Sequence, residues 1–341
     1  MILIGMLRKY KKPMIKDTVA AMFAKEYNAE SVFFNASNID FTNKKIKGLK
    51  YEKGNWIQTE SDFPNVVYND IPLKNDIYIY NKLEKQGIPF TTHRLAKNKL
   101  SIYKIMKENE VLSKFLIDTF AFESFDNFNE MLQKYETVFL KPNRGHKGLG
   151  MFIFEKLDKK VKCQDSKGIV TIIPENSLDS FLSNIKDIEF YHIQPRIKFL
   201  TSSGNPYVIR SYVGRDKVGE WVPLFHYAAI GEGKNSIVNV SLGSSISYIT
   251  PFLKNRYGEE QGLDFKRKLN AVAVGTARQI QKDIDFKIDA LGIDLGIDEE
   301  NNIFIIEVNA FPGTRPFEAL VEKHAIPYSI YLAKNKSNKN S

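Results

Sequence analysis

The chain of 341 residues has a single cysteine, Cys163, so it can form neither an intrachain disulfide nor a zinc site built from several cysteines. It also lacks any apolar run long enough to cross a bilayer. We therefore expect a cytoplasmic protein that makes no membrane contact. Cys163 stands in the polar stretch DKKVKCQDSKG, and we interpret it as a loop residue without a catalytic role.

A secretory signal and a Walker A loop are also missing. The apolar opening MILIGML precedes its basic cluster instead of following it, so we expect a first β-strand there. No GKS or GKT sequence occurs. The net charge of +9 favours an anionic ligand such as a nucleoside triphosphate, a nucleic acid or an acidic peptide. Because the basic residues are scattered, we expect no specific nucleic-acid binding.

The pattern of apolar residues changes twice along the chain, near residues 95 and 187, and this predicts three parts and a tail. The first part mixes short apolar runs with one helix, which is typical of a small α/β domain. The third begins with three strands that we expect to be antiparallel. The limits are 1–95, 96–187 and 188–333, with a disordered tail at 334–341. The expected fold class is α/β (α+β).

Helical periodicity and capping residues predict several helices within these parts. Their ranges are 14–27, 98–106, 125–135, 178–185 and 262–283. The longest of them places Leu269, Val272, Ala273, Thr276 and Ile280 at helical spacing.

An oxygen-rich hairpin is predicted near the C-terminal end, where ALGIDLGI and IFIIEVN flank the turn EENN. Strand alternation puts Glu307 and Asn309 on one face. A turn centred after Glu300 places Asp294 opposite Glu307, and a turn one residue later places it opposite Asn309. Three hard oxygen ligands on one face suit Mg²⁺. The alternative is a solvent-facing set of polar residues on an amphipathic hairpin.

A second constellation follows the strand TVFLK, which ends in Lys141. A lysine at the end of an apolar strand is costly unless an anion compensates its charge, so it indicates a phosphate partner. The loop NRGHKGLG then supplies glycines, bases and backbone amides, as phosphate-cradling loops do. Its candidate residues are Arg144, Gly145, Lys147, Gly148 and Gly150. Lys99, at a helix start, is another candidate for phosphate binding. The alternative for the glycine-rich loop is a plain hairpin, and the alternative for Lys99 is a solvated lysine on a helix surface.

Together, FLKPNRGHKGLG, the helix-starting Lys99 and the D…E-x-N set resemble the ATP-grasp superfamily. More narrowly, LGIDLGIDEENNIFIIEVNAFPG and the N-terminal segments IGMLRKYKKP, FFNASNIDF and NVVYNDIP resemble the YheC/YheD family of endospore coat-associated proteins. The resemblance implies an ATP-grasp fold with a small N-terminal pre-ATP-grasp α/β domain. It also implies that 96–187 is a small subdomain with a glycine-rich lid and that 188–333 carries the metal site.

The resemblance also implies roles for single residues. Lys99 and Lys141 would bind ATP phosphates, and Arg210 would act with Lys141 in catalysis by holding the transferring phosphate. Backbone atoms of Gln194, Pro195, Arg196 and Ile197 would meet adenine, and Asn239 resembles the asparagine of a later loop. The sequence departs from the superfamily pattern at three positions. Thr201 stands where the superfamily has a ribose-binding carboxylate, Val208 where it has an aspartate, and Ser244 where it has a glycine.

The activity implied is an ADP-forming carboxylate–amine ligase that uses ATP with one or two Mg²⁺ ions, Mn²⁺ being an alternative. Its partners would be ATP, a small-molecule or peptide carboxylate and an amine. The alternatives are a structural spore-coat component with the same fold, a kinase acting on another acceptor and, more weakly, a nucleic-acid binder. A homodimer or association with the spore coat is a further hypothesis.

Overall fold

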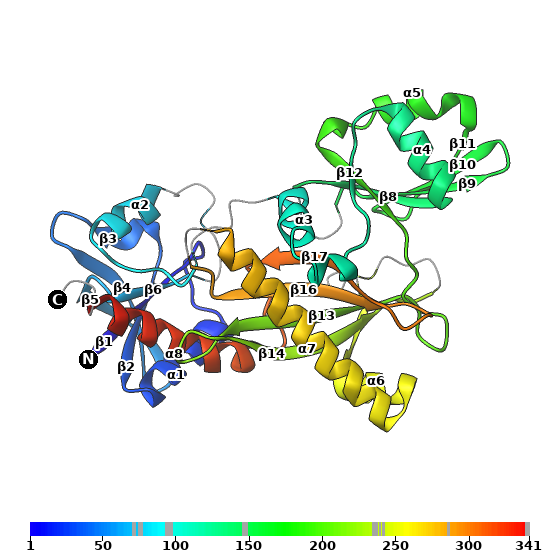
Figure 1. Ribbon diagram of the computed structural model, residues 1–341. Coiled ribbons are helices and arrows are strands. Elements are labelled where there is room, and N and C mark those ends of the chain that lie inside the picture. The colour runs from blue at the N-terminus through cyan, green and yellow to red at the C-terminus, as the bar shows by residue number, and fades with distance from the viewer. Residues whose placement is uncertain are drawn as a thin grey trace.

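The computed structural model describes residues 1–69, 73, 78–92, 98–144, 149–233, 238, 240, 243–284 and 287–337. Within these ranges the strands form three sheets, each with its own helices and core (Figure 1). None of the described helices combines the length and the apolar content that a membrane span needs.

The N-terminal sheet mixes parallel and antiparallel strands in the order β3-β4-β2-β1-β6, with β5 on β4. β1 is parallel to both β2 and β6, and the apolar opening forms β1 as predicted. Buried side chains from β1, β2 and α1 form its core. The strands are β1 (Ile2–Leu7), β2 (Ala29–Phe34), β3 (Ile39–Asp40), β4 (Lys45–Glu52), β5 (Asn55–Asp62) and β6 (Val66–Tyr68), and the helices are α1 (Ile15–Glu26) and α2 (Tyr78–Lys85).

The middle sheet has the order β11-β10-β9-β8-β12-β7, and α4 and α5 pack on the face opposite the rest of the molecule (Figure 1). The predicted helix at 125–135 is confirmed. The strands are β7 (Phe120–Ala121), β8 (Thr137–Pro142), β9 (Phe152–Leu157), β10 (Lys160–Asp165), β11 (Val170–Pro174) and β12 (Tyr191–Pro195), and the helices are α4 (Phe125–Tyr135) and α5 (Leu178–Ser183).

The third sheet is antiparallel in the order β15-β14-β13-β16-β17 and packs against the long helix α7, whose five predicted apolar-face residues are all buried. α3 crosses α7 and begins at the predicted cap, Asn98. The strands are β13 (Tyr207–Arg215), β14 (Trp221–Ile230), β15 (Ser245–Tyr248), β16 (Ala290–Ile297) and β17 (Ile303–Ala310), and the helices are α3 (Lys99–Lys107), α6 (Ile249–Tyr257) and α7 (Glu259–Lys282).

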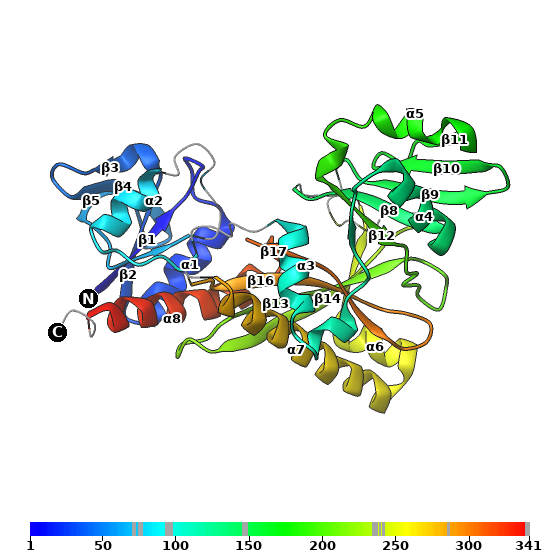
Figure 2. The same ribbon diagram turned by 45° about the horizontal axis from the view of Figure 1, so that its top comes forward.

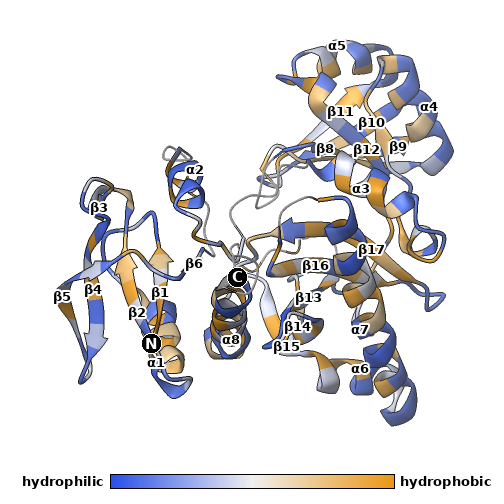
Figure 3. Ribbon diagram, turned by 60° about the vertical axis from the view of Figure 1, so that its left-hand side comes forward, coloured by the Kyte–Doolittle hydropathy of each residue, from blue (hydrophilic) through white to orange (hydrophobic). Residues whose placement is uncertain are grey.

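The C-terminal helix α8 (Glu318–Ser337), which the sequence patterns did not predict, returns to the N-terminal domain (Figure 3). Ile326 and Tyr328 join the core of that domain, and the Tyr68 hydroxyl donates to Glu322 Oε1 at 3.0 Å. The tail expected to be disordered from 334 onward continues this helix as far as Ser337, and 338–341 lie outside the described residues.

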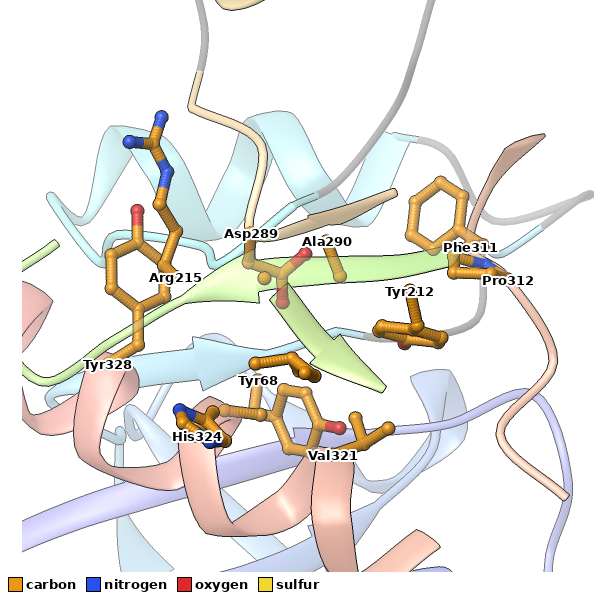
Figure 4. Close-up of a pocket in the computed structure, with 13 residues that line it drawn as sticks. Tyr68, Tyr212, Arg215, Asp289, Ala290, Phe311, Pro312, Val321, His324 and Tyr328 are labelled. Carbon is orange, nitrogen blue, oxygen red and sulfur yellow. The ribbon is translucent and has the colours of Figure 1, made fainter. Parts of the chain in front are cut away.

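The junction between α8, the third sheet and the N-terminal domain encloses a cavity of about 20 Å³, space for one water molecule (Figure 4). Tyr68 lines the cavity from the N-terminal domain, and His324 lines it from α8. Its Asp289 accepts a hydrogen bond from the Thr92 hydroxyl at 2.5 Å. Buried polar contacts therefore fix the N-terminal domain against the third sheet.

Two local expectations were wrong. Cys163 does not lie in a loop: it points into the core from β10 and is 2% exposed, and burial raises the pKa of its thiol to about 12. The segment HIQPRI does not pair with the two strands that follow it, because β12 pairs with β8 and β7 of the middle sheet. β12 thus belongs with the strands before residue 187, and the other domain limits stay a prediction.

Truncating Leu269 of α7 should lower stability strongly, since its side chain is 0% exposed in the largest core. We expect Leu269→Ala to cost about 2–5 kcal/mol through lost burial and a residual cavity. Thermal unfolding measures the loss. Lys268→Ala, which removes the neighbouring side chain with 59% exposure, is the control and should change the melting temperature little. Equal losses in both variants would contradict the packing of α7.

Candidate functional site

A cleft of about 1670 Å³ runs between the three sheets. The N-terminal domain contributes Ile15, the middle sheet contributes Phe139 and Lys141, and the third sheet contributes Arg210 and Glu307. The cleft therefore brings the two constellations found in the sequence, far apart along the chain, to one place.

The oxygen-rich face is formed by the hairpin of β16 and β17. Asp294 lies directly opposite Glu307, which is the first of the two registers considered from the sequence. Further toward the turn, Leu295 pairs with Ile305, so Ile306 is an extra residue and forms a bulge. Both carboxylates line the cleft together with Asn309.

Arg210 lies on β13 directly opposite Asp294 and holds its carboxylate with two nitrogens. Its Nε donates to Oδ1 at 2.5 Å and its Nη2 to Oδ2 at 3.1 Å. Asn309 Nδ2 donates to the same Oδ2 at 3.1 Å. Burial lowers the pKa of Arg210, but Asp294 outweighs burial and raises it above its ordinary value. The guanidinium therefore stays charged beside the carboxylate.

Lys99 provides the counter-charge for the second carboxylate. Its Nζ lies 3.2 Å from Glu307 Oε1, and the two side chains are 26% and 29% exposed. The position of Lys99 follows from the helix start, because the Asn98 side chain accepts from Ser101 N at 2.8 Å. The backbone amide of Lys99 donates to Asn143 O at 3.2 Å, which joins α3 to the end of β8.

Lys141 projects into the cleft from the end of β8. Its Nζ donates to Gln194 Oε1 at 2.6 Å, and Gln194 Nε2 donates to Thr119 Oγ1 at 3.1 Å. Burial lowers the pKa of Lys141 to about 8, while Glu307 opposes this change. A phosphate anion would offset the desolvation cost of this lysine, which is the reason that a phosphate partner was expected from the sequence.

His192 is a buried neighbour of the site that the sequence patterns did not single out. It lies opposite Lys141 on β12, and its Nδ1 is 2.8 Å from Asn143 Oδ1. Burial, with Lys141 and Lys99, lowers its pKa to about 3, so the imidazole is neutral. Strand alternation could have revealed it, because it shares the face of Gln194 two residues on.

The predicted adenine segment, Gln194 to Ile197, lines the cleft beside the apolar side chains of Phe139 and Ile153. One backbone amide of this segment is not free to bind a ligand, because the Arg196 amide donates to Thr137 O at 3.0 Å. A base in this position would therefore depend on the remaining backbone groups.

The glycine-rich loop is described only at its ends. Arg144 is exposed, and neither it nor Gly150 is among the residues that line the cleft. Gly150 has φ +75°, a conformation that favours glycine. Gly145, Lys147 and Gly148, like Asn239 of the later loop, lie outside the described residues.

The oxygen set fits a hard divalent cation only in part. In the described ranges no three His, Cys, Asp or Glu side chains come together as a metal site. Asp294, Glu307 and Asn309 offer two carboxylates and an amide, so Mg²⁺ would need further oxygens from phosphate or water. The donor chemistry suits that ion, and the neighbouring cations suit the phosphate.

Comparison with known proteins agrees with this geometry. The family described as YheC/D like ATP-grasp matches residues 87–332. The endospore coat-associated protein YheD of Bacillus subtilis (strain 168) is 22% identical over 321 residues, 88% of this chain and 70% of the relative.

Two solved structures show the same fold over nearly the whole chain. The ATP-grasp ligase PsnB, in complex with a minimal precursor, aligns with a TM-score of 0.56 at 11% identity, over 97% of this chain and 99% of its own. The D-alanine-D-alanine ligase from Coxiella burnetii aligns with a TM-score of 0.55 at 9% identity, over 100% and 98%. The expected α/β ATP-grasp fold is thus confirmed.

Neutral His192 should make stability depend on pH. Its ordinary pKa of 6.5 falls to about 3 in the folded chain, so below pH 6.5 the unfolded chain binds more protons and stability decreases as the pH falls. We expect His192→Gln, which keeps an amide near Asn143, to show a smaller loss of melting temperature between pH 6.5 and pH 4 than the unsubstituted chain. Parallel pH profiles for both would contradict the neutral buried imidazole.

Proposed function

The chain belongs to the YheC/D-like ATP-grasp family, and on this premise we propose that it is an ATP- and Mg²⁺-dependent ligase that joins a carboxylate to an amine. The observation that carries the proposal is the convergence on one cleft of three cations and an oxygen-rich face. The cations are Lys99, Lys141 and Arg210, and the oxygen-rich face consists of Asp294, Glu307 and Asn309.

The residues divide into two sets by charge. Lys99, Lys141 and Arg210 would neutralise the phosphates of ATP and the charge that develops during transfer. Asp294, Glu307 and Asn309 would hold Mg²⁺, which supplies charge neutralisation on the phosphate oxygens when it is bound. Phe139 and Ile153 offer an apolar surface for the base.

In the proposed reaction, a carboxylate oxygen of the substrate attacks the γ-phosphorus of ATP and ADP leaves, which gives an acyl phosphate. An amine then attacks the acyl carbon, inorganic phosphate departs with the bonding electron pair, and the amine loses a proton to form an amide. Catalysis would come from positioning and charge neutralisation rather than from a covalent nucleophile. Arg210 is placed to hold the transferred phosphate.

Two further observations support a ligase. PsnB and the D-alanine-D-alanine ligase, which share the fold, are both described as ligases. Lys141 bears a desolvation cost that an anionic ligand would relieve. We extend the proposal to an ADP-forming reaction in the cytoplasm with one or two Mg²⁺ ions, Mn²⁺ being an alternative.

A second candidate is a structural spore-coat component that keeps the fold without catalysis. The observation in its favour is that both carboxylates already have protein partners, Asp294 with Arg210 and Glu307 with Lys99, so neither carboxylate needs a ligand to be compensated. The name of the relative YheD points the same way. A homodimer or coat association would belong to this candidate.

Nucleotide binding can be measured by thermal unfolding. We expect ATP with Mg²⁺ to raise the melting temperature, since a ligand at about 100 times its Kd stabilises by about 2.7 kcal/mol. Glu307→Gln should reduce this rise because it removes one metal-binding charge. Glu300→Gln, an isosteric change at the turn of the same hairpin, should leave it unchanged. No rise in the unsubstituted chain would refute nucleotide binding.

Product analysis separates a ligase from the alternatives. We expect ADP release to require a carboxylate, and hydroxylamine to intercept the acyl phosphate as a hydroxamate. Arg210→Lys should slow this release by at least about tenfold, because a lysine cannot reproduce the two-nitrogen hold on Asp294. A phosphorylated product that survives hydroxylamine would indicate a kinase. Nucleotide binding without ADP release from any carboxylate and amine pair would favour the structural component.

A further inference from the structure

The loop between β1 and α1, residues 8–13, leads directly into the cleft but has no part in the proposed reaction. We call it the basic loop, because its sequence is RKYKKP. Its exposed lysines are Lys9, Lys11 and Lys12. The residues that follow it and line the cleft are Met14, Ile15 and Lys16. Figure 2 shows this loop, in dark blue, on the side of the N-terminal domain that faces the middle of the molecule.

Buried Asp17 fixes the conformation of the basic loop. Its Oδ1 accepts from Arg8 Nε at 2.8 Å, and its Oδ2 accepts from the Tyr10 hydroxyl and from Met14 N, each at 2.8 Å. Arg8 and Asp17 are both 0% exposed. A loop pinned at its start, its middle and its end presents its lysines in a set arrangement, which lowers the entropy lost when they bind a ligand.

The cleft lining includes another exposed cation, Arg315, in the loop that follows β17. In the part of the chain that the structure describes, no carboxylate lies within ion-pair distance of Arg315 or of the three lysines of the basic loop. The interior differs, since Arg210 is paired with Asp294 and Lys99 with Glu307. Positive charge without a carboxylate partner is therefore found on the basic loop, which leads into the cleft, and on Arg315 in the cleft lining. We call this part of the cleft, with the basic loop and Arg315, the mouth.

The size of the cleft and the lining of its mouth indicate the kind of ligand. A volume of about 1670 Å³ exceeds the roughly 300–1,000 Å³ of small-molecule pockets, so a second large ligand fits beside a nucleotide. Ile15, with 76% of its side chain exposed, and Phe311 add apolar contacts at the same end. Positive charge mixed with apolar side chains suits a peptide better than a sugar-phosphate backbone.

We propose that this mouth binds an acidic peptide segment, whose side-chain carboxylate is the group that the ligase activates. This inference rests on the proposed function, and it names the substrate class of the same site. The basic loop and Arg315 would hold flanking carboxylates, while one carboxylate reaches the cleft interior. Ile15 and Phe311 would contact the aliphatic parts of the peptide.

The test measures binding of a short fluorescein-labelled oligo-L-glutamate at low salt by fluorescence anisotropy. Lys11→Glu with Lys12→Glu, and separately Arg315→Glu, should each weaken binding by roughly tenfold, because each reverses charge at the mouth. The control is Lys25→Glu with Lys47→Glu, which makes the same change in net charge as the double variant at exposed lysines of α1 and β4, outside the basic loop. This control should stay within about twofold of the unsubstituted chain.

Three results would overturn the inference. Equal weakening by the control pair would show attraction to net charge alone. Tighter binding of a single-stranded oligonucleotide of matched charge would identify a nucleic-acid surface. Competition by free glutamate as effective as that by the oligomer would show that a single amino acid, not a peptide, is the substrate.

The melting-temperature rise with ATP and Mg²⁺, measured on the same samples, separates this inference from the proposed function. We expect that rise to persist in both mouth variants, because neither changes a residue of the nucleotide site. A rise with ATP but no peptide binding would refute only the inference. Mouth-dependent peptide binding without any rise would refute the proposed function and leave the peptide site standing.

Discussion

The ion pair between Arg210 and Asp294 is the contact around which the floor of the cleft is built. Strand register brings these side chains together, because Asp294 on β16 pairs with Arg210 on one neighbouring strand and with Glu307 on the other. Two adjacent, half-buried carboxylates would repel each other and take up protons unless cations compensate them. Arg210 supplies one such cation from within the sheet. The fork of two nitrogens also fixes the carboxylate so that Asn309 can donate to it.

The second carboxylate needs a cation that the sheet does not provide, and this requirement ties distant elements together. Lys99 reaches Glu307 from the first turn of α3, which packs on α7 and is joined to β8 through Asn143. Asn143 also contacts His192, which stays neutral in a neighbourhood that already holds Lys141 and Lys99. The helix, the middle sheet and the third sheet are thus positioned by the same charges.

The parts of the fold predictable from sequence were those set by local patterns. The apolar face of α7, the Asn98 cap and the hairpin that carries Asp294 and Glu307 each depend on neighbours in the chain, and all three were confirmed. The pairing of β12 with β8 depends on contacts across about fifty residues, which no local pattern encodes.

Other misses have separate causes. Cys163 alternates with lysines along β10, so a half-buried strand looked like a polar loop. α8 contains Pro327, and proline is unfavourable in a helix interior. Because α8 is buried against the N-terminal domain, its apolar residues do not form the single stripe by which an amphipathic helix is recognised in a sequence. Of the candidate site, Asp294, Glu307 and Lys141 could be found because charged side chains are unusual in apolar strands, and Lys99 because it follows a helix cap. Strand alternation places His192 on the face of Gln194, but it was missed because the pairing that brings this face beside Lys141 is not local in sequence.

The paired charges also constrain how ligands can enter. In the proposed site, each ligand would compete with an ion pair of the protein. Phosphate would take Lys99 and Arg210, which now pair with Glu307 and Asp294, and a divalent cation would take those two carboxylates. Phosphate alone would take the cations and leave two carboxylates uncompensated, whereas a metal ion alone would leave the cations uncompensated. If both bound, every charge released from an ion pair would find a new partner. On the proposed function, the floor of the cleft would therefore favour a metal–phosphate pair over either ion alone, which would be a positive coupling set by strand register.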